Sequence, residues 1–161
     1  PFAHLPLFSR GKRQQCSNIG RLREQSQELI FCDYRYTVGQ GKKSNSHLCN
    51  CLCLIGQFDL PDFEIGPEDV FSKIAQAVGY HDIDFSFDEE FSKLFVLRGA
   101  DEQRIRALFS PAVMQRLKQN KGARLEGTTG AIVYYSSHQI PAEKVASWLD
   151  EARKTLQLLV S

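Results

Sequence analysis

The chain has 161 residues, which is long enough to bury a hydrophobic core and favours one domain over two. Hydrophobic residues at 42% and charged residues at 24% are ordinary for a globular protein, and a net charge of +1 gives no indication of a nucleic-acid partner. No apolar run approaches the roughly 18 to 20 residues of a membrane-spanning helix, so these residues contain no such helix.

The first third of the chain predicts three strands. Residues 1–17 are expected to be an irregular, basic N-terminal segment. A short strand is predicted at 18–23 and a longer one at 28–38, which is rich in aromatic and β-branched residues. A polar loop with two glycines leads to a return strand at 47–55, so the last two strands form a hairpin.

The middle of the chain alternates between extended and helical patterns. A short extended piece is predicted at 59–65, and a helix follows from Gly66 to Gly79 with Pro67 in its first turn. Residues 81–90, HDIDFSFDEE, are predicted to be an acidic loop with some extended structure. A strand at 93–98 comes next.

The last third has the clearest periodicity. A helix is predicted at 102–109, and a second one starts at Ser110 and continues to Asn120. Strands at 123–126 and 131–136 then form a hairpin around two glycines. A final amphipathic helix begins at Pro141.

These elements predict the order βββ-α-β-α-β-β-α, with about three helices. Because the strands gather in hairpins instead of alternating with every helix, the fold class is α+β, with a mainly antiparallel sheet. Residues 18–161 are expected to form one domain, preceded by the N-terminal segment 1–17.

Five cysteines raise the question of a metal or redox site. Their number is odd and three lie within five residues, which is unlike a secreted disulfide framework and indicates reduced thiols in the cytoplasm. Cys49, Cys51 and Cys53 alternate along the strand 47–55 and therefore share one face. Neighbours on one face lie about 6.6 Å apart, so these thiolates do not easily converge on one tetrahedral ion. We interpret them as a buried strand face, with thiol chemistry or a metal ion as alternatives.

The hairpin register decides which residue each thiol meets. If the hairpin is symmetric about Lys42 and Lys43, a cross-strand thiol pair becomes feasible and two tyrosine rings cover the remaining thiols. The expected partners are Cys32 with Cys53, Tyr34 with Cys51, and Tyr36 with Cys49.

No other pattern predicts a catalytic residue, a cofactor or a metal ion. His81 and five carboxylates lie within 81–90, but this spacing lacks the glycine and the closing glutamate of an EF-hand loop. Ile83, Phe85 and Phe87 between the acids are typical of core anchors. No strand is followed by a nucleophile elbow, a phosphate-binding loop or a dinucleotide fingerprint, and no helix contains the H-E-x-x-H zinc motif.

The hairpin loop is the best candidate for a partner surface. Its glycines and lysines join two antiparallel strands and lead into no helix that would receive a phosphate. If the domain binds a partner, Lys42 and Lys43, with Tyr34 and Tyr36 as exposed aromatic neighbours, are the predicted contact residues; the alternative is a flexible, solvated basic loop.

Several phrases resemble a family of uncharacterised bacterial proteins, namely CDYRYTVGQGKK, LPDFEIGPEDVFSKI and FSKLFVLRGADEQRIRALFSP. In that family one or two predicted transmembrane helices precede a cytosolic domain, and the resemblance runs from about Cys16 to Leu158. It implies a membrane anchor upstream of Pro1, but no catalytic residue. It also implies that the cysteines of the strand 47–55 replace ordinary apolar residues. The basic cluster at 10–13 fits the cytoplasmic edge of a membrane span, or else a disordered polar tail.

Two functions from different classes follow. The first is a non-enzymatic cytoplasmic binding or assembly domain of a bacterial membrane-associated protein, whose partner is another protein or a membrane-anchored segment of the same chain. The second is an enzyme, in which the acidic loop 81–90 and the cysteine-bearing hairpin would have to converge in one cleft. The absence of any catalytic motif favours the first.

Overall fold

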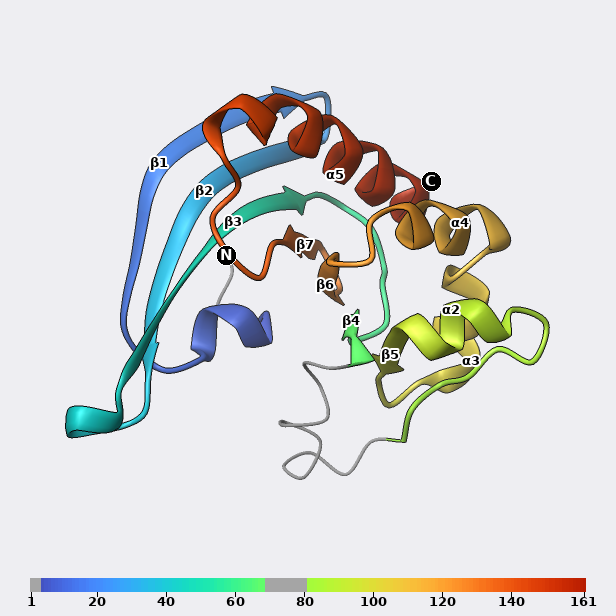
Figure 1. Ribbon diagram of the computed structural model, residues 1–161. Helices are drawn as coiled ribbons and strands as arrows, with labels where there is room; N and C mark the ends of the chain where they lie inside the picture. The colour runs from blue at the N-terminus through green and yellow to red at the C-terminus, as the bar shows by residue number, and fades with distance from the viewer. Residues whose placement is uncertain (1–3, 69–80) are drawn as a thin grey trace.

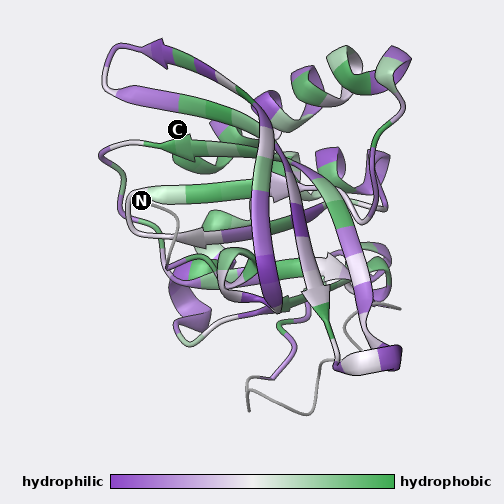
Figure 2. Cartoon of the chain, turned by 90° about the vertical axis from the view of Figure 1, so that its left-hand side faces the viewer, coloured by the Kyte–Doolittle hydropathy of each residue, from purple (hydrophilic) through white to green (hydrophobic). Residues whose placement is uncertain are grey.

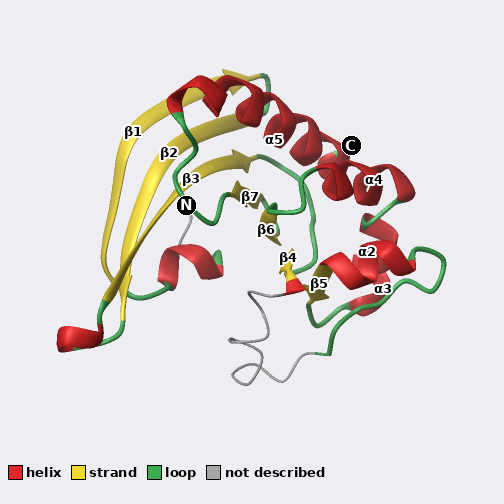
Figure 3. Ribbon diagram, in the orientation of Figure 1, coloured by secondary structure: helices red, strands yellow, loops and turns green. Residues whose placement is uncertain are grey.

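A computed structural model of the chain describes residues 4–68 and 81–161. It contains one seven-stranded sheet in the order β1-β2-β3-β7-β6-β4-β5, in which every neighbouring pair is antiparallel. Helices pack on one face of this sheet (Figures 1 and 3). The predicted α+β class, with a mainly antiparallel sheet, is therefore confirmed.

The strands fall into a long group and a short group. The long strands are β1 (Lys12–Glu24), β2 (Gln27–Val38) and β3 (Asn45–Ile55). The short ones are β4 (Phe63–Pro67), β5 (Phe95–Arg98), β6 (Arg124–Thr128) and β7 (Ala131–Tyr135). The three long strands bend away from the body of the sheet, and the turn that joins β2 to β3 projects furthest from it (Figure 1).

Three of the α-helices in the described residues begin at a side-chain cap. The described helices are α2 (Glu89–Leu94), α3 (Glu102–Leu108), α4 (Pro111–Gln119) and α5 (Val145–Val160), with the short 3₁₀ helices η1 (Pro6–Ser9), η2 (Gly41–Lys43) and η3 (Ala142–Lys144). The side chains of Asp88, Asp101 and Ser110 accept hydrogen bonds from the first turns of α2, α3 and α4. The predicted helices after Asp101 and Ser110 and the C-terminal helix are confirmed.

The two faces of the sheet build two separate cores. Leu52 and Leu54 of β3 face α5 and join a large aliphatic and aromatic core on the helix side. Cys49, Cys51 and Cys53 point to the opposite face, where Leu5 and Leu7 of the N-terminal segment cover them. We call this opposite side the inner face, because the long strands bend around η1 there (Figure 1).

Three local predictions differ from the structure. Strand β1 starts at Lys12, within the segment expected to be irregular, and all of its residues are exposed, so no alternation of apolar residues could mark it. Helix α2 replaces part of the expected acidic loop, because Asp88 caps a turn that the aromatic residues had suggested was extended. The helix expected at 66–79 lies almost entirely outside the described residues, and Pro67 belongs to β4.

The predicted hairpin register is wrong by two residues. Cys32 lies opposite Cys51, Tyr34 opposite Cys49, and Tyr36 opposite His47. The turn centre falls between Gly41 and Lys42, since both turn glycines adopt a positive φ, 93° at Gly39 and 56° at Gly41, and η2 closes the loop.

Candidate functional site

A cluster of exposed cations lies at and beside the β2–β3 turn, next to the start of β1. Residues 1–23 and 34–58 together contain eight basic residues and no acidic one, although the whole chain has a net charge of only +1. The rest of the chain is therefore net acidic. Five of the eight cations are exposed at or beside the β2–β3 turn, and we call them the basic tip: Lys12, Arg13, Arg35, Lys42 and Lys43.

The basic tip is not neutralised by the protein itself. Within residues 4–68 and 81–161, none of its five side chains forms an ion pair. The β2–β3 turn projects from the body of the sheet and is mainly hydrophilic at its end (Figure 2). Val38, which is 46% exposed, lies beside the turn. The tip is thus a positively charged projection with one apolar residue beside its turn.

The predicted aromatic part of the partner surface is wrong. Tyr34 and Tyr36 are only 2% and 8% exposed, because their side chains point to the inner face. The Tyr34 ring contacts Phe8 edge-on with a centroid distance of 4.9 Å, and Tyr36 stacks on His47 at 5.0 Å. These rings hold the N-terminal segment in place, whereas Lys42 and Lys43 are exposed as expected.

The five cysteines gather on the inner face, and we call them the thiol row. Cys32, Cys49, Cys51 and Cys53 are buried, and Cys16 is exposed on the edge strand β1. The Cys49 and Cys51 sulfur atoms lie 3.8 Å apart. Cys16 lies opposite Tyr34, so its side chain points to the same face as Cys32.

The thiols have different acidities because their surroundings differ. Hydrogen bonding from the Cys51 thiol lowers the pKa of Cys32, with a further contribution from Cys16. Burial raises the pKa of Cys51 and of Cys53 well above the ordinary value, and burial together with Cys32 raises that of Cys16 to about 11. Among Cys16, Cys32, Cys51 and Cys53, Cys32 therefore becomes a thiolate most readily.

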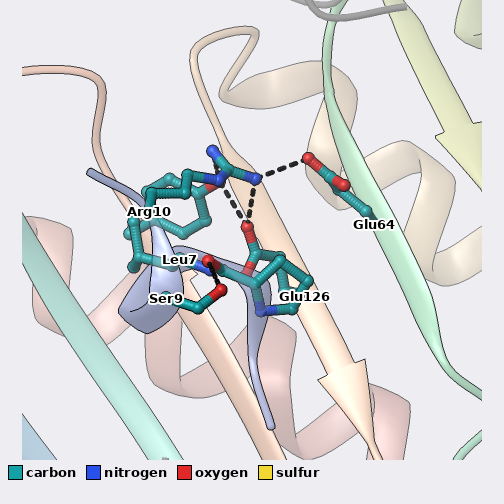
Figure 4. Close-up of polar contacts among 7 residues, drawn as sticks. Leu7, Ser9, Arg10, Glu64 and Glu126 are labelled. Atoms are coloured by element: carbon teal, nitrogen blue, oxygen red, sulfur yellow. Dashed lines mark hydrogen bonds and ion pairs between the residues drawn. The ribbon is translucent and has the colours of Figure 1, made fainter. Parts of the chain in front are cut away.

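A buried carboxylate beside the thiol row fixes the N-terminal segment. Glu126 of β6 is fully buried and accepts hydrogen bonds from the backbone N–H of Leu7 at 2.6 Å and the Tyr135 hydroxyl at 2.9 Å. Arg10 bridges Glu126 and Glu64, at 2.6 Å from each (Figure 4). Burial raises the pKa of Glu126, although Arg10 and the Leu7 N–H oppose the shift. Both carboxylate oxygens of Glu126 accept hydrogen bonds, so we interpret this cluster as a structural anchor for the N-terminal segment.

The sequence gives no signal for this anchor. Arg10 reads as one more cation of a basic segment, and Glu126 lies 116 residues away in a strand with no special pattern. Only the antiparallel pairing of β4 with β6 brings Glu64 and Glu126 side by side beneath η1.

The acidic segment 81–90 is dispersed over the helix side. Asp82 accepts a hydrogen bond from the Leu97 N–H at 2.9 Å, and Asp88 pairs with Lys118 at 2.8 Å. Phe85 belongs to the helix-side core as predicted, but Phe87 is 68% exposed, so its predicted role as a core anchor is wrong. The described residues contain no group of three or more His, Cys, Asp or Glu side chains placed to hold a metal ion.

The thiols and the acids do not share a cleft in the described part of the chain. A surface hollow of about 610 Å³ beside the acidic segment is lined by residues of that segment and of α2 and α3, whereas the thiol row packs in the core of the opposite face. The convergence that an enzyme of the expected kind requires is therefore missing among these residues.

Comparisons with known proteins identify no relative of the chain. No protein-family model, no curated protein and no solved structure matches the chain. Within residues 4–68 and 81–161, none of the helices is both long enough and apolar enough to cross a membrane. The functional argument therefore rests on the basic tip, the thiol row and the anchor that positions them.

Proposed function

We propose that the chain is a non-enzymatic binding domain on the cytoplasmic side of a bacterial membrane, and that its basic tip binds the anionic bilayer surface. The observation that supports the proposal is the exposure of five cations that form no ion pair within the described part of the chain. Cations that a protein leaves unpaired and projects from its body are available to an anionic partner.

The strength of such binding follows from the number of charges. Each Lys or Arg near an anionic leaflet contributes about 1 kcal/mol, and the attraction fades within a Debye length of roughly 8 Å at physiological salt. Five cations at and beside one projecting turn give a useful but reversible affinity. Val38 adds a small apolar contact, which bilayers accept and bulk water does not.

A bilayer suits the basic tip better than a nucleic acid does. Proteins that bind single strands stack bases on exposed aromatic rings. The two tyrosines nearest the tip are buried, and the one large aromatic residue exposed in the described chain, Phe87, lies in the segment before α2. The tip therefore offers charge without a stacking surface.

The proposed membrane anchor upstream of Pro1 fits a domain whose basic tip faces the bilayer. Residues 4–10 pass over the inner face and lead directly into Lys12 and Arg13. An anchor that holds the domain near the bilayer would raise the local concentration of anionic lipid at the tip and strengthen weak binding.

Vesicle co-sedimentation tests the proposal. We expect the protein to bind phosphatidylcholine vesicles that contain 30% phosphatidylglycerol, to ignore pure phosphatidylcholine, and to dissociate in high salt. Lys42→Ala combined with Lys43→Ala should weaken binding by roughly 30-fold, since two lost cations remove about 2 kcal/mol. The matched control is Lys93→Ala with Lys154→Ala, which removes two lysines from helices.

Three outcomes would overturn the proposal. Equal binding to both vesicle types, or equal weakening by the control variant, would show that the basic tip does not recognise the anionic surface. Tight binding of an oligonucleotide by a protein that ignores anionic vesicles would assign the tip to nucleic acid instead.

A further inference from the structure

The proposed membrane binding makes no use of the thiol row. Three of its members, Cys16, Cys32 and Cys51, lie on the adjacent strands β1, β2 and β3 with their side chains on the inner face. The first is exposed, whereas the second and third are 5% and 0% exposed. The three thiols therefore form a path from solvent into the core of this face.

The geometry of Cys32 and Cys51 suits a covalent link. The two residues are direct partners in the antiparallel β2–β3 ladder. Directly opposed residues have Cα atoms about 4.5 to 5.5 Å apart, which lies within the span of about 4.4 to 6.8 Å that disulfides bridge. Cys53, in contrast, lies opposite Ile30 and has no cysteine partner across that ladder.

We propose that the thiol row is a two-electron oxidation site, in which a hydroperoxide oxidises Cys16 and the oxidation is transferred inward to form a Cys32–Cys51 disulfide.

The steps balance with the hydroperoxide as the only oxidant. The Cys16 thiolate attacks the terminal peroxide oxygen, the O–O bond breaks, and an alcohol leaves while Cys16 becomes a sulfenic acid. The Cys32 thiolate then attacks the Cys16 sulfur and releases water once a proton is taken up. In the last step the Cys51 thiolate attacks the Cys32 sulfur, and Cys16 leaves as a thiolate. The proton that Cys51 lost is then taken up by Cys16.

The positions of the three strands favour the last step. Thiol–disulfide exchange needs the attacking and leaving sulfurs on opposite sides of the central one. Cys32 belongs to β2, which lies between β1 with Cys16 and β3 with Cys51, so attack and departure occur on opposite sides. The net reaction converts two thiols and a hydroperoxide into a disulfide, an alcohol and water.

The oxidation should be slow at neutral pH and faster in base. Because the pKa of Cys16 is raised to about 11, only a small fraction of this thiol is ionised at pH 7. The rate should rise about tenfold for each pH unit between pH 7 and pH 9, since the thiolate is the nucleophile.

Oxidation of the folded protein followed by peptide mapping tests the proposal. The reduced chain is treated with hydrogen peroxide under native conditions, blocked with an alkylating agent and digested with trypsin. Trypsin releases Cys32 as the only cysteine of peptide 24–35, so fragmentation of its linked product identifies the partner. We expect a Cys32–Cys51 link and a loss of two hydrogens from the intact mass.

Variants at three positions separate the steps. Cys16→Ser should slow the formation of the same link by at least tenfold. Cys51→Ala should stop the reaction at a Cys16–Cys32 disulfide, and Cys51→Val, which keeps an apolar side chain of similar size, provides the same test if the smaller alanine impairs folding. Cys53→Ala is the matched control, since Cys53 is as buried as Cys51 and its loss should change neither rate nor product.

Other products would overturn the proposal. A Cys16–Cys16 dimer, or sulfinic acid at Cys16 with Cys32 and Cys51 still alkylated, would mean that oxidation stays at the surface. Oxidation of Cys16→Ser at the rate of the unmodified protein would remove Cys16 as the entry point. None of these results depends on vesicle binding, so this proposal and the proposed function fail separately.

Discussion

The two faces of the sheet solve the problem of burial in different ways. The helix side is covered by α2 to α5 over a core of aliphatic and aromatic side chains such as Leu125 and Phe91. The inner face is covered by η1, a helix of four residues, over thiols, tyrosines and a buried carboxylate. Strand β3 supplies both, with Leu52 and Leu54 on one side and Cys51 and Cys53 on the other.

The comparison shows where specific polar contacts replace bulk packing. On the helix side many apolar contacts together stabilise the packing, so no single polar pair is essential there. On the inner face a short segment with only two buried leucines must be held, and the Arg10–Glu126–Glu64 cluster supplies the directional contacts. Stability should therefore respond to single polar changes far more on the inner face than on the helix side.

The largest effect should come from Arg10→Ala. This change leaves the fully buried Glu126 carboxylate without its cation, and breaking a buried pair in this way costs about 3 to 5 kcal/mol. Urea unfolding monitored by the fluorescence of Trp148 measures the free energy of unfolding. The control is Lys93→Ala on the helix side, which removes an exposed i,i+4 pair with Glu89 and should cost about 0.5 kcal/mol or less.

The pH dependence of the Arg10→Ala variant should identify Glu126 as the cause. The pKa of Glu126 is already raised by burial, and loss of Arg10 raises it further. A folded-state pKa above the unfolded value means that the native protein takes up a proton first, so stability falls as pH rises from the unfolded pKa through the folded one. The variant should thus lose less stability at pH 5 than at pH 8, and an equal loss at both would contradict the cluster.

The sequence revealed the helix side far better than the inner face, for physical reasons. Helices α3, α4 and α5 and the β6–β7 hairpin follow from local caps, periodicity and turn residues. Strand β1 has no buried residue and therefore no pattern, although its pairing with β2 covers nine positions. The Arg10–Glu126 contact depends on tertiary structure alone. The sequence predicted only part of the basic tip. Lys42 and Lys43 lie in the predicted turn, whereas Arg35 lies near them only because of how the strands pair.

A packing change on the helix side should have a smaller effect than the loss of Arg10. A Cβ atom at Gly127 would lie 2.2 Å from Cε1 of Phe63, whose ring is buried in the helix-side core. Gly127→Ala should therefore destabilise the protein by about 1 to 3 kcal/mol through overpacking. Gly20→Ala in β1 is the control, because nothing lies within 4 Å of the added atom. If Gly20→Ala lowered the free energy of unfolding as much as Gly127→Ala, the open space beside Gly20 in the edge strand would be contradicted.

A single thiol on the inner face should matter less again. Cys53 is 1% exposed and packs as a small apolar side chain, so Cys53→Ala removes one heavy atom and should cost about 1 kcal/mol. Cys53→Ser should cost more, because it buries a hydroxyl among apolar neighbours. The two free energies of unfolding are compared at pH 7 under reducing conditions, and a serine variant as stable as the alanine one would show that water reaches this part of the inner face.

The smallest effect should come from a polar pair on the helix side, Asp88 with Lys118. Hydrogen bonding from Lys118 lowers the pKa of Asp88, so the folded state holds this carboxylate ionised to lower pH than the unfolded chain does. Its contribution is therefore present above the ordinary pKa of 3.8 and disappears as pH falls through the lower folded value. Asp88→Asn should be slightly less stable than the parent at pH 7 and indistinguishable from it near pH 2. Because the side chain also caps α2, and Asn caps nearly as well as Asp, the difference isolates the charge pair. A loss at pH 7 comparable to that of Arg10→Ala would remove the distinction between the two faces.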